Sequence, residues 1–180
     1  MPRVRIGMTS MTPLLLPVAA MIVVIVASNI LVQHPINDWL TWGALTYPIA
    51  FLVTDLTNRA HGPAAARRVV QVGFAVAVAL SAMLATPRIA AASGFAFLTA
   101  QLLDVHVFDR LRGRTWWQPP LASSVVGSGV DTILFFSLAF VGTGVPWVTL
   151  AAGDFVVKLG LALVMLLPFG AVALRSLSRS

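Results

Sequence analysis

Long apolar runs divide the chain into six segments that are separated by short polar connections. A helix needs roughly 20 mainly apolar residues to cross the hydrocarbon core of a bilayer, and each run is close to that length. The pattern therefore predicts six transmembrane helices, at residues 13–32, 40–58, 69–85, 89–108, 121–141 and 147–167. Pro48 lies inside the second run and predicts a kink, which membrane helices tolerate.

Polar side chains interrupt the fourth run at helical spacing. Phe97, Gln101, Asp104 and Phe108 are four, three and four residues apart, so they share one helix face. A carboxylate inside lipid costs about 3 kcal/mol or more, so an intramembrane acid indicates a function by default. The plain alternative for Asp104 is solvation at the cytoplasmic interface, helped by Arg110.

The remaining candidate polar and aromatic positions lie on the second, fifth and sixth runs: Tyr47, Phe51, Asp55, Asn58, Ser124, Ser128, Asp131, Phe135, Asp154 and Lys158. Asp154 and Lys158 are four apart and can form an ion pair, structural or coupling, on one helix. For Asp131 the plain alternative is a hydrogen bond to Ser128 or to a neighbouring helix, and for Asp55 it is interfacial solvation beside Arg59. We interpret Gly127, Gly129 and Ser123 as sites of close helix packing.

Composition supports an integral membrane protein. The 180 residues are 58% hydrophobic and only 10% charged, whereas soluble domains carry about 25% charged residues. The length indicates a single domain over residues 1–180. The net charge of +6 comes from arginines at the ends of apolar runs and not from one patch, so nucleic-acid binding is not expected. The chain has no cysteine, and its three histidines are scattered, so we expect no metal and no cofactor.

The distribution of basic residues predicts the topology. Ten of the 12 Lys and Arg residues fall in the N-terminal tail, the second and fourth connections, and the C-terminal tail. Arg88 stands alone on the opposite side, and Lys158 lies within a helix. The positive-inside rule therefore places both termini in the cytoplasm. The first run follows a basic start, but its length and the further runs favour an uncleaved helix over a signal peptide.

If these faces meet in one cavity, its chemistry suits a small planar heterocycle. Aromatic rings can stack on a flat ring, carboxylates accept from N–H groups, and amides can bond a base edge. On the residues alone, the protein is a polar-lined transporter or channel of unknown substrate.

Several segments resemble one known family. They are TWGALTYPIAFLVTDL (Thr41–Leu56), GPAAARRVV (Gly62–Val70), RIAAASGFAFLTAQLLDVHVFDRLR (Arg88–Arg112), SSVVGSGVDTILFF (Ser123–Phe136) and DFVVKLGLALVMLLP (Asp154–Pro168). With D-L-x-N, Q-x-x-D-V-x-V-F and V-D-T in this order, the chain is similar to the queuosine precursor transporter family, formerly grouped as vitamin uptake transporters.

The resemblance implies a six-helix carrier of the bacterial inner membrane. It would import 7-cyano-7-deazaguanine and 7-aminomethyl-7-deazaguanine for salvage into tRNA queuosine, and it would not be an enzyme. The positions that match the family motifs are Asp55, Asn58, Gln101, Asp104, Ser128, Asp131, Asp154 and Lys158. As a hypothesis, Gln101, Asp104 and Asp131 contact the base edge while Phe51 and Phe97 stack on it.

The chain departs from the family at two places. Many members carry Glu at the position of Arg59 and an aromatic residue at that of His61, so no role is transferred to either. Members often have a longer connection than Thr86-Pro87-Arg88, which makes a short or re-entrant third helix an alternative.

Two other functions stay open at this point. One is an intramembrane enzyme with paired aspartates, although no metal spacing or Ser–His arrangement supports it. The other is a membrane subunit that binds a different heterocycle or vitamin and depends on an energising partner, since the chain has no P-loop. Two energy sources fit the sequence: a facilitated uniporter whose substrate is trapped by metabolism, and a proton symporter that uses one of the aspartates. Neither precursor is favoured, and no oligomeric state is predicted.

Overall fold

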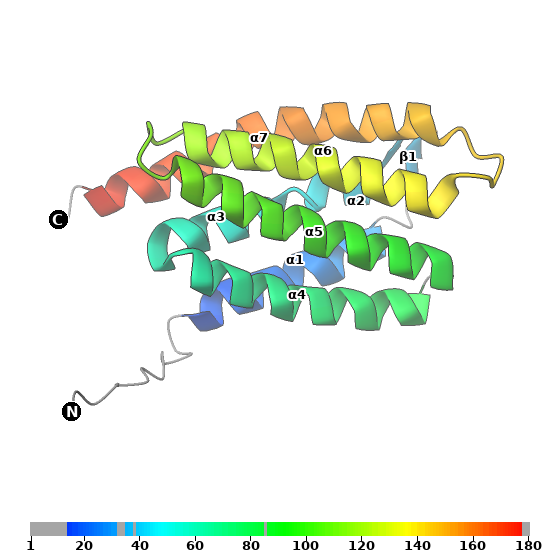
Figure 1. Cartoon of the computed structure of the whole chain (residues 1–180), viewed down its shortest axis with the longest axis horizontal. Coiled ribbons are helices and arrows are strands. Elements are labelled where there is room, and N and C mark those ends of the chain that lie inside the picture. Colours follow the sequence, from blue (N-terminus) through cyan, green and yellow to red (C-terminus); the bar gives the residue numbers. More distant parts are fainter. Residues whose placement is uncertain (1–13, 32–34, 38, 85, 178–180) are drawn as a thin grey trace.

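Seven α-helices and one short antiparallel ladder form the part of the chain that the computed structural model describes, residues 14–31, 35–37, 39–84 and 86–177 (Figure 1). In chain order the elements are α1 Leu15–Leu31, β1 Pro35–Asn37, β2 Leu40–Thr41, α2 Trp42–Thr46, α3 Ile49–His61, α4 Pro63–Leu84, α5 Pro87–Leu111, α6 Gln118–Phe140 and α7 Trp147–Leu177. The two strands pair Pro35 with Thr41 and Asn37 with Leu40. The sequence pattern did not predict this ladder, but it predicted six helical segments, with α2 and α3 together as the second.

The second segment is broken, not merely kinked. α2 ends at Thr46, α3 begins at Ile49, and Tyr47 and Pro48 form a turn between them. Pro48 has no N–H to continue the ladder of α2, and its fixed φ suits the start of a new helix. The break places the Tyr47 side chain at the junction of two helices.

Several helix ends lie beyond the apolar runs that predicted them. Gly62 adopts a φ of +84° and donates its N–H to Asn58 O at 2.9 Å, which ends α3, and Pro63 then opens α4. α4 is a continuous helix of 22 residues, so the third helix is neither short nor re-entrant. α7 continues past Pro168 to Leu177, because one missing hydrogen bond does not end a membrane helix.

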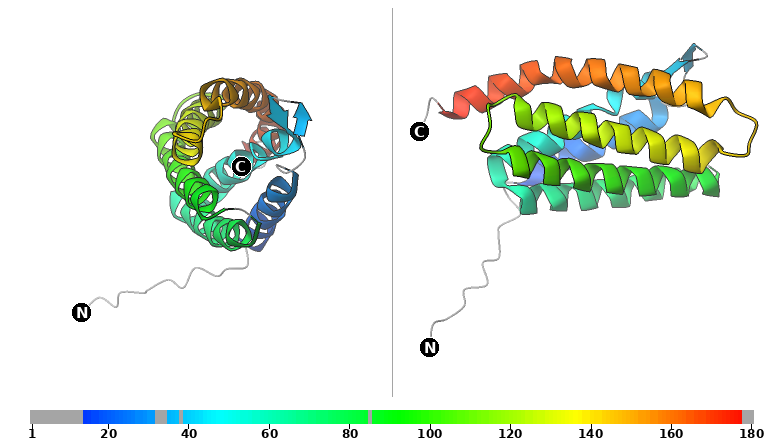
Figure 2. Two further views of the ribbon diagram at one scale, coloured as in Figure 1. Left: turned by 90° about the vertical axis from the view of Figure 1, so that its right-hand side faces the viewer. Right: turned by 45° about the horizontal axis from the view of Figure 1, so that its top comes forward.

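The helices run roughly parallel to one axis, with α3 packed inside the arrangement. α3 contacts α1, α4, α5 and α7, while α5 packs along both α4 and α6. Figure 2 shows the outer helices arranged around this axis. The start of α1 and the end of α7 lie at the same end of the bundle (Figures 1 and 2).

The surface of the bundle is apolar and its interior is partly polar. Leu16, Met83 and Leu167 are 79%, 82% and 75% exposed, whereas Gln101 and Asp104 are 0% exposed. Among the described residues, four helices are long and apolar enough to cross a membrane, and Leu15–Ser28 is a shorter apolar helix. This inversion of the usual soluble pattern is expected when lipid surrounds the protein.

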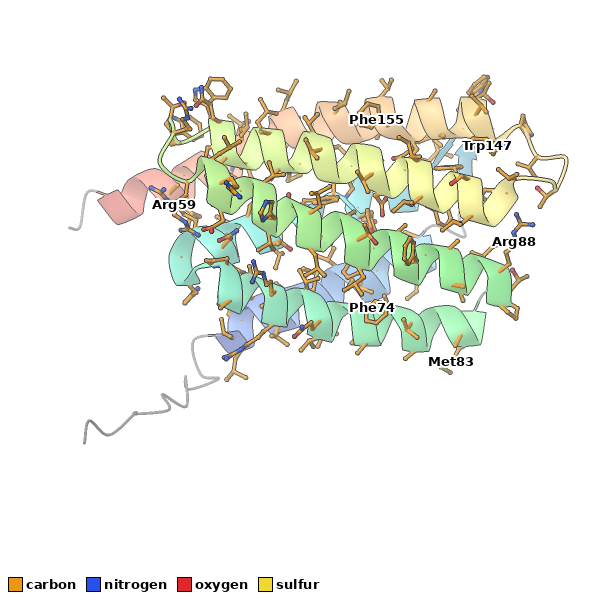
Figure 3. All side chains as sticks on the ribbon, in the orientation of Figure 1. Arg59, Phe74, Met83, Arg88, Trp147 and Phe155 are labelled. Carbon is orange, nitrogen blue, oxygen red and sulfur yellow. The ribbon has the colours of Figure 1, made fainter. Side chains whose placement is uncertain are left out.

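Arginines mark both ends of the bundle. Figure 3 places Arg59 near one end and Arg88 at the other, next to the turn that leads to Trp147. The Arg88 guanidinium donates to Leu138 O at 2.8 Å and to Val141 O at 2.6 Å, where α6 ends. The cation therefore satisfies free carbonyl groups at a helix C-terminus. Which end faces the cytoplasm stays a prediction of the positive-inside rule.

Candidate functional site

Two carboxyl groups meet inside the bundle, Asp55 from α3 and Asp104 from α5, and both side chains are buried. On α6, the Ser123 hydroxyl donates to Asp55 Oδ1 at 3.0 Å, and the Ser124 hydroxyl donates to Asp55 Oδ2 at 3.4 Å. Asp55 and Asp104 lie at the same level of the α3–α5 interface, because residues beside them are bonded across it: Thr54 to Gln101 Oε1 at 2.6 Å and Asn58 to Val105 O at 3.1 Å. We call Asp55, Asp104, Ser123 and Ser124 the acid–serine cluster.

Polar atoms without a partner adjoin this cluster on α5. Among the described residues, the buried side-chain atoms that lack any hydrogen-bond partner are Gln101 Nε2 and both carboxyl oxygens of Asp104. The two residues are three apart, so they share a helix face. Each unsatisfied buried polar group costs about 1–3 kcal/mol. A ligand that bonds both residues would recover that cost.

The other end of the Gln101 amide is already engaged. The Thr54 hydroxyl on α3 donates to Gln101 Oε1 at 2.6 Å and lies 3.0 Å from Ala50 O. Because a hydroxyl can donate or accept, a half-turn of the amide would keep a bond to Thr54 and exchange the free end. Gln101 can therefore offer a ligand a donor or an acceptor.

A second polar group, the lysine cluster, joins the helix break to α6 and α7. Lys158 Nζ donates to Asp131 Oδ2 at 2.8 Å and to Thr132 Oγ1 at 3.2 Å, and it pairs with Asp154 Oδ2 at 2.6 Å. The Tyr47 hydroxyl donates to Asp131 Oδ1 at 3.1 Å, and the Thr132 hydroxyl donates to Asp154 Oδ2 at 2.8 Å. All three N–H donors of Lys158 are used, so this cluster is internally satisfied.

The lysine cluster contains the expected ion pair and one unexpected member. Asp154 and Lys158 pair on α7 as their spacing predicts, but Lys158 also binds Asp131 across the helix interface. The hydrogen bonds of Asp131 go to neighbouring elements and not to Ser128 on its own helix. Ser128 is buried, and its hydroxyl belongs to neither cluster in the described part of the chain. With two acids and one base, the lysine cluster carries one net negative charge.

Asn58 is committed to protein contacts. Its amide donates to Val105 O on α5 at 3.1 Å, and the Arg112 guanidinium donates both to Asn58 O, at 2.8 Å, and to Asn58 Oδ1. Arg112 also pairs with Asp109 at 3.0 Å. These bonds connect the ends of α3 and α5 and satisfy a carbonyl at the α3 C-terminus. The structure thus places Asn58 beside the acid–serine cluster as a tie between helices.

Two buried aromatic rings, Phe51 on α3 and Phe97 on α5, pack against the Tyr47 ring of the lysine cluster. The ring centroids of Phe51 and Phe97 are 6.2 and 6.3 Å from that of Tyr47, both in edge-to-face geometry. Phe51 is held against α6, where a Cβ on Gly127 would come within 2.7 Å of its ring and 3.3 Å of Ala100 O. Gly127 therefore serves close packing, as expected, and fixes the Phe51 ring beside the buried polar groups.

Two expectations from the sequence are wrong in this region. Asp55 and Asp104 are not solvated at an interface, because both are buried, and none of the ion pairs that the described residues form connects either acid to Arg59 or Arg110. Ser123 is not only a small packing residue, since its hydroxyl bonds Asp55. The burial of the two acids and the bond of Ser123 both depend on which residues meet across a helix interface. The spacing of residues within one helix does not predict those contacts.

Some participants had no distinct signal in the sequence. Thr54 and Thr132 are ordinary in apolar helices, and only the packing of α3 on α5 and of α6 on α7 gives them partners. Tyr47 was already a candidate from its helix face, and its position before Pro48 is a second signal, because broken membrane helices often line binding sites. No group of three or more His or Asp residues suited to a metal occurs in the described ranges.

These features define a class of protein: a multi-pass membrane protein with an apolar exterior and a polar interior, part of which lacks partners within the chain. Such an interior is typical of proteins that carry small polar molecules across the bilayer.

Comparison with known proteins identifies the family within that class. Residues 41–173 match the family described as "Putative vitamin uptake transporter", and the chain belongs to it. The chain is 35% identical to the queuosine precursor transporter of Escherichia coli (strain K12), over 87% of this chain and 84% of that protein. It is 35% identical to the probable queuosine precursor transporter of Haemophilus influenzae, over 88% and 85%, and 27% identical to that of Bacillus subtilis (strain 168), over 70% and 68%. No solved structure matches the chain significantly. The protein is thus a multi-pass transporter of the bacterial inner membrane.

Proposed function

We propose that this protein imports the queuosine precursors 7-cyano-7-deazaguanine and 7-aminomethyl-7-deazaguanine. The observation that carries the proposal is the unpartnered face of α5, where Gln101 Nε2 and both Asp104 oxygens are buried without a hydrogen bond from the described residues. The names of the relatives that are 35% identical supply the class of substrate.

The hydrogen-bonding pattern of this face matches the edge that both precursors share. A guanine-like base presents a carbonyl oxygen, a ring N–H and an amino group along one edge. The Asp104 carboxylate would accept from the ring N–H and the amino group, and the Gln101 amide would donate to the carbonyl oxygen. An adenine-like edge has an amino group where guanine has its carbonyl and lacks the ring N–H, so it would leave Asp104 unfilled.

The neighbouring residues of the site have separate roles in this proposal. Phe51 and Phe97 provide the apolar surface against which the base plane lies. Both oxygens of Asp131 are held by Tyr47 and Lys158, so Asp131 positions the Tyr47 ring and does not bond the base edge. Ser128 is buried on α6 next to Gly127, which packs against the Phe51 ring. The bond from Asn58 to Val105 O ties α5 to α3.

The proposal is tested by uptake of labelled 7-cyano-7-deazaguanine in bacteria that can neither make nor import it. The readout is queuosine in tRNA at low external precursor, with and without this chain. We expect the chain to restore queuosine, and an excess of 7-deazaguanine, but not of 7-deazaadenine, to compete. Failure of a membrane-inserted protein to restore queuosine would overturn the proposal.

A matched pair of variants tests the assigned residue. Asp104→Asn removes a charge-assisted acceptor worth about 1.5–3 kcal/mol, so uptake at low precursor should fall about 10- to 150-fold. Asp109→Asn removes an acid of the same helix whose carboxylate is exposed and pairs with Arg112 at the surface. It should leave uptake nearly unchanged, because exposed pairs contribute little. Equal uptake by both variants at equal expression would contradict the role of Asp104.

A further inference from the structure

The acid–serine cluster places two carboxyl groups side by side with no cation to balance them. Asp55 and Asp104 are 2% and 0% exposed, and the ion pairs among the described residues involve neither. The lysine cluster differs in this respect, because there Lys158 separates the two acids. The cluster around Asp55 and Asp104 therefore needs another source of positive charge.

The charged groups on the surrounding elements do not supply it. On α5, His106 and Arg110 are exposed, and Arg112, just past the end of this helix, is committed to Asn58 and Asp109. α6 contributes only the hydroxyls of Ser123 and Ser124. On α7, Lys158 is fully used within the lysine cluster. Neither Asp55 nor Asp104 faces a described cation on any of these helices.

Two adjacent carboxylates cannot both stay ionised in a medium of low dielectric, and such pairs hold one proton between them. The packing places the two acids in this situation, because both are buried and the bonds from Thr54 to Gln101 and from Asn58 to Val105 O hold α3 against α5 at their level. A membrane-buried acid that exchanges its proton is a usual element of proton-driven transport.

We propose that Asp55 and Asp104 form a proton-binding site that couples uptake of the base to inward movement of one proton. This inference rests on the proposed function. The proton enters from the outer side, is shared as a bond from the Asp55 carboxylic acid to the Asp104 carboxylate, and leaves to the cytoplasm with the base.

The bound base assigns the proton to Asp55, because its N–H groups require Asp104 as the anionic acceptor. The hydroxyl donors at Asp55 would by themselves favour its ionised form, so the proton moves to Asp55 only when the base is bound. Ser123 and Ser124 hold the Asp55 carboxyl group in place, and no described residue donates to Asp104. A carboxylate has about four acceptor positions, so one bond from Asp55 leaves both Asp104 oxygens able to accept from a ligand. With the proton on Asp55, Asp104 stays an anion that can accept from the N–H groups of the base. Without the proton, the same site would hold two buried negative charges. Proton and base therefore bind together.

The experiment uses the purified full chain in liposomes and two assays. The first is exchange of labelled for unlabelled 7-cyano-7-deazaguanine at equal pH on both sides, which tests transport alone. The second is net uptake under a pH gradient, acid outside, with the membrane potential clamped by potassium and valinomycin. One proton per neutral base allows about tenfold accumulation per pH unit, and this accumulation should vanish with a protonophore.

Variants separate the two acids. Asp55→Asn keeps a hydrogen-bond donor toward Asp104 but cannot release a proton, so it should still exchange and should not accumulate under the gradient. Asp104→Asn should lose both activities, and Asp109→Asn should keep both. A pH dye enclosed with the unaltered protein tests the coupling without any variant, since adding 7-cyano-7-deazaguanine outside should acidify the lumen.

The outcomes distinguish the two proposals. No exchange by the unaltered protein would overturn the proposed function and, with it, the coupling. Exchange without accumulation or lumen acidification would overturn the coupling alone. Accumulation by Asp55→Asn, or loss of exchange in a folded Asp55→Asn protein, would overturn the assignment of the proton to Asp55.

Discussion

Replacing Lys158 by Met should destabilise the bundle strongly, because it removes the one cation of the lysine cluster. Lys158 is 5% exposed and lies 2.8 Å from Asp131 and 2.6 Å from Asp154. Met has a similar length, so the change leaves little empty volume. It does leave two carboxylates on adjacent helices without a cation, the buried Asp131 and the mostly buried Asp154.

The size of the stability loss distinguishes an effect of unpaired charge from a simple loss of hydrogen bonds. Hydrogen bonds between membrane helices contribute about 0.6 kcal/mol each on average, so losing the three bonds of Lys158 would cost about 2 kcal/mol. Leaving buried charges unpaired costs about 3–5 kcal/mol. At the roughly 2–4 °C per kcal/mol typical of chains of this length, the larger cost lowers the melting temperature by roughly 6–20 °C.

The assay is thermal unfolding of the purified protein in detergent, followed by loss of the monodisperse species. A neutral control carries Asp131→Asn and Asp154→Asn together with Lys158→Met. It loses the same ammonium group but leaves no buried charge, so it should recover much of the lost stability. If Lys158→Met costs less than about 2 kcal/mol, or the neutral control is no more stable than Lys158→Met, the electrostatic reasoning is wrong.

Two further predictions concern packing and topology. Gly127→Ala should lower stability by about 1–3 kcal/mol, since its Cβ would lie 2.7 Å from the buried Phe51 ring. Gly129→Ala should be tolerated, because its Cβ would meet no atom closer than 3.6 Å. Equal melting temperatures of the two variants would contradict this prediction. The chain has no cysteine, so single substitutions report sidedness. A membrane-impermeant maleimide should label Thr143→Cys in intact spheroplasts and Gly113→Cys only after permeabilisation, and the reverse pattern would refute cytoplasmic termini.

The helices could be predicted from the sequence because lipid exposure imposes a pattern that does not depend on partners. Each apolar run reports where the chain meets hydrocarbon. It does not report where a helix ends, since a helix can extend into the interfacial region. α4 thus begins at Pro63, ahead of the predicted residue 69, and its first turns carry the exposed Arg67 and Arg68. The length of an apolar run reports how much of a helix lies in the hydrocarbon core. The residues at which the helix begins and ends are set by its capping residues.

The site was predictable only as far as each helix determines its own faces. Spacing placed Gln101 with Asp104 on one face and Asp154 with Lys158 on another. It could not show that Asp131 shares the cation of Asp154, or that Asp55 has Asp104 as its neighbour and not an arginine. Those pairings depend on the rotation and depth at which α3, α5, α6 and α7 pack. Both facts arise between helices, where a single sequence carries no direct signal.

The contrast between the two clusters indicates which buried polar residues hold the fold and which act on a ligand. In the lysine cluster, every N–H of Lys158 and both oxygens of Asp131 have a partner, so adding a ligand there would require breaking existing bonds. Gln101 and Asp104 instead carry a desolvation cost that no described residue offsets. A fold gains nothing from such a cost when the site is empty. Binding of a base and a proton at the unpartnered face of α5 would therefore offset this desolvation cost. The lysine cluster holds Tyr47 and the helix break in place beside that face.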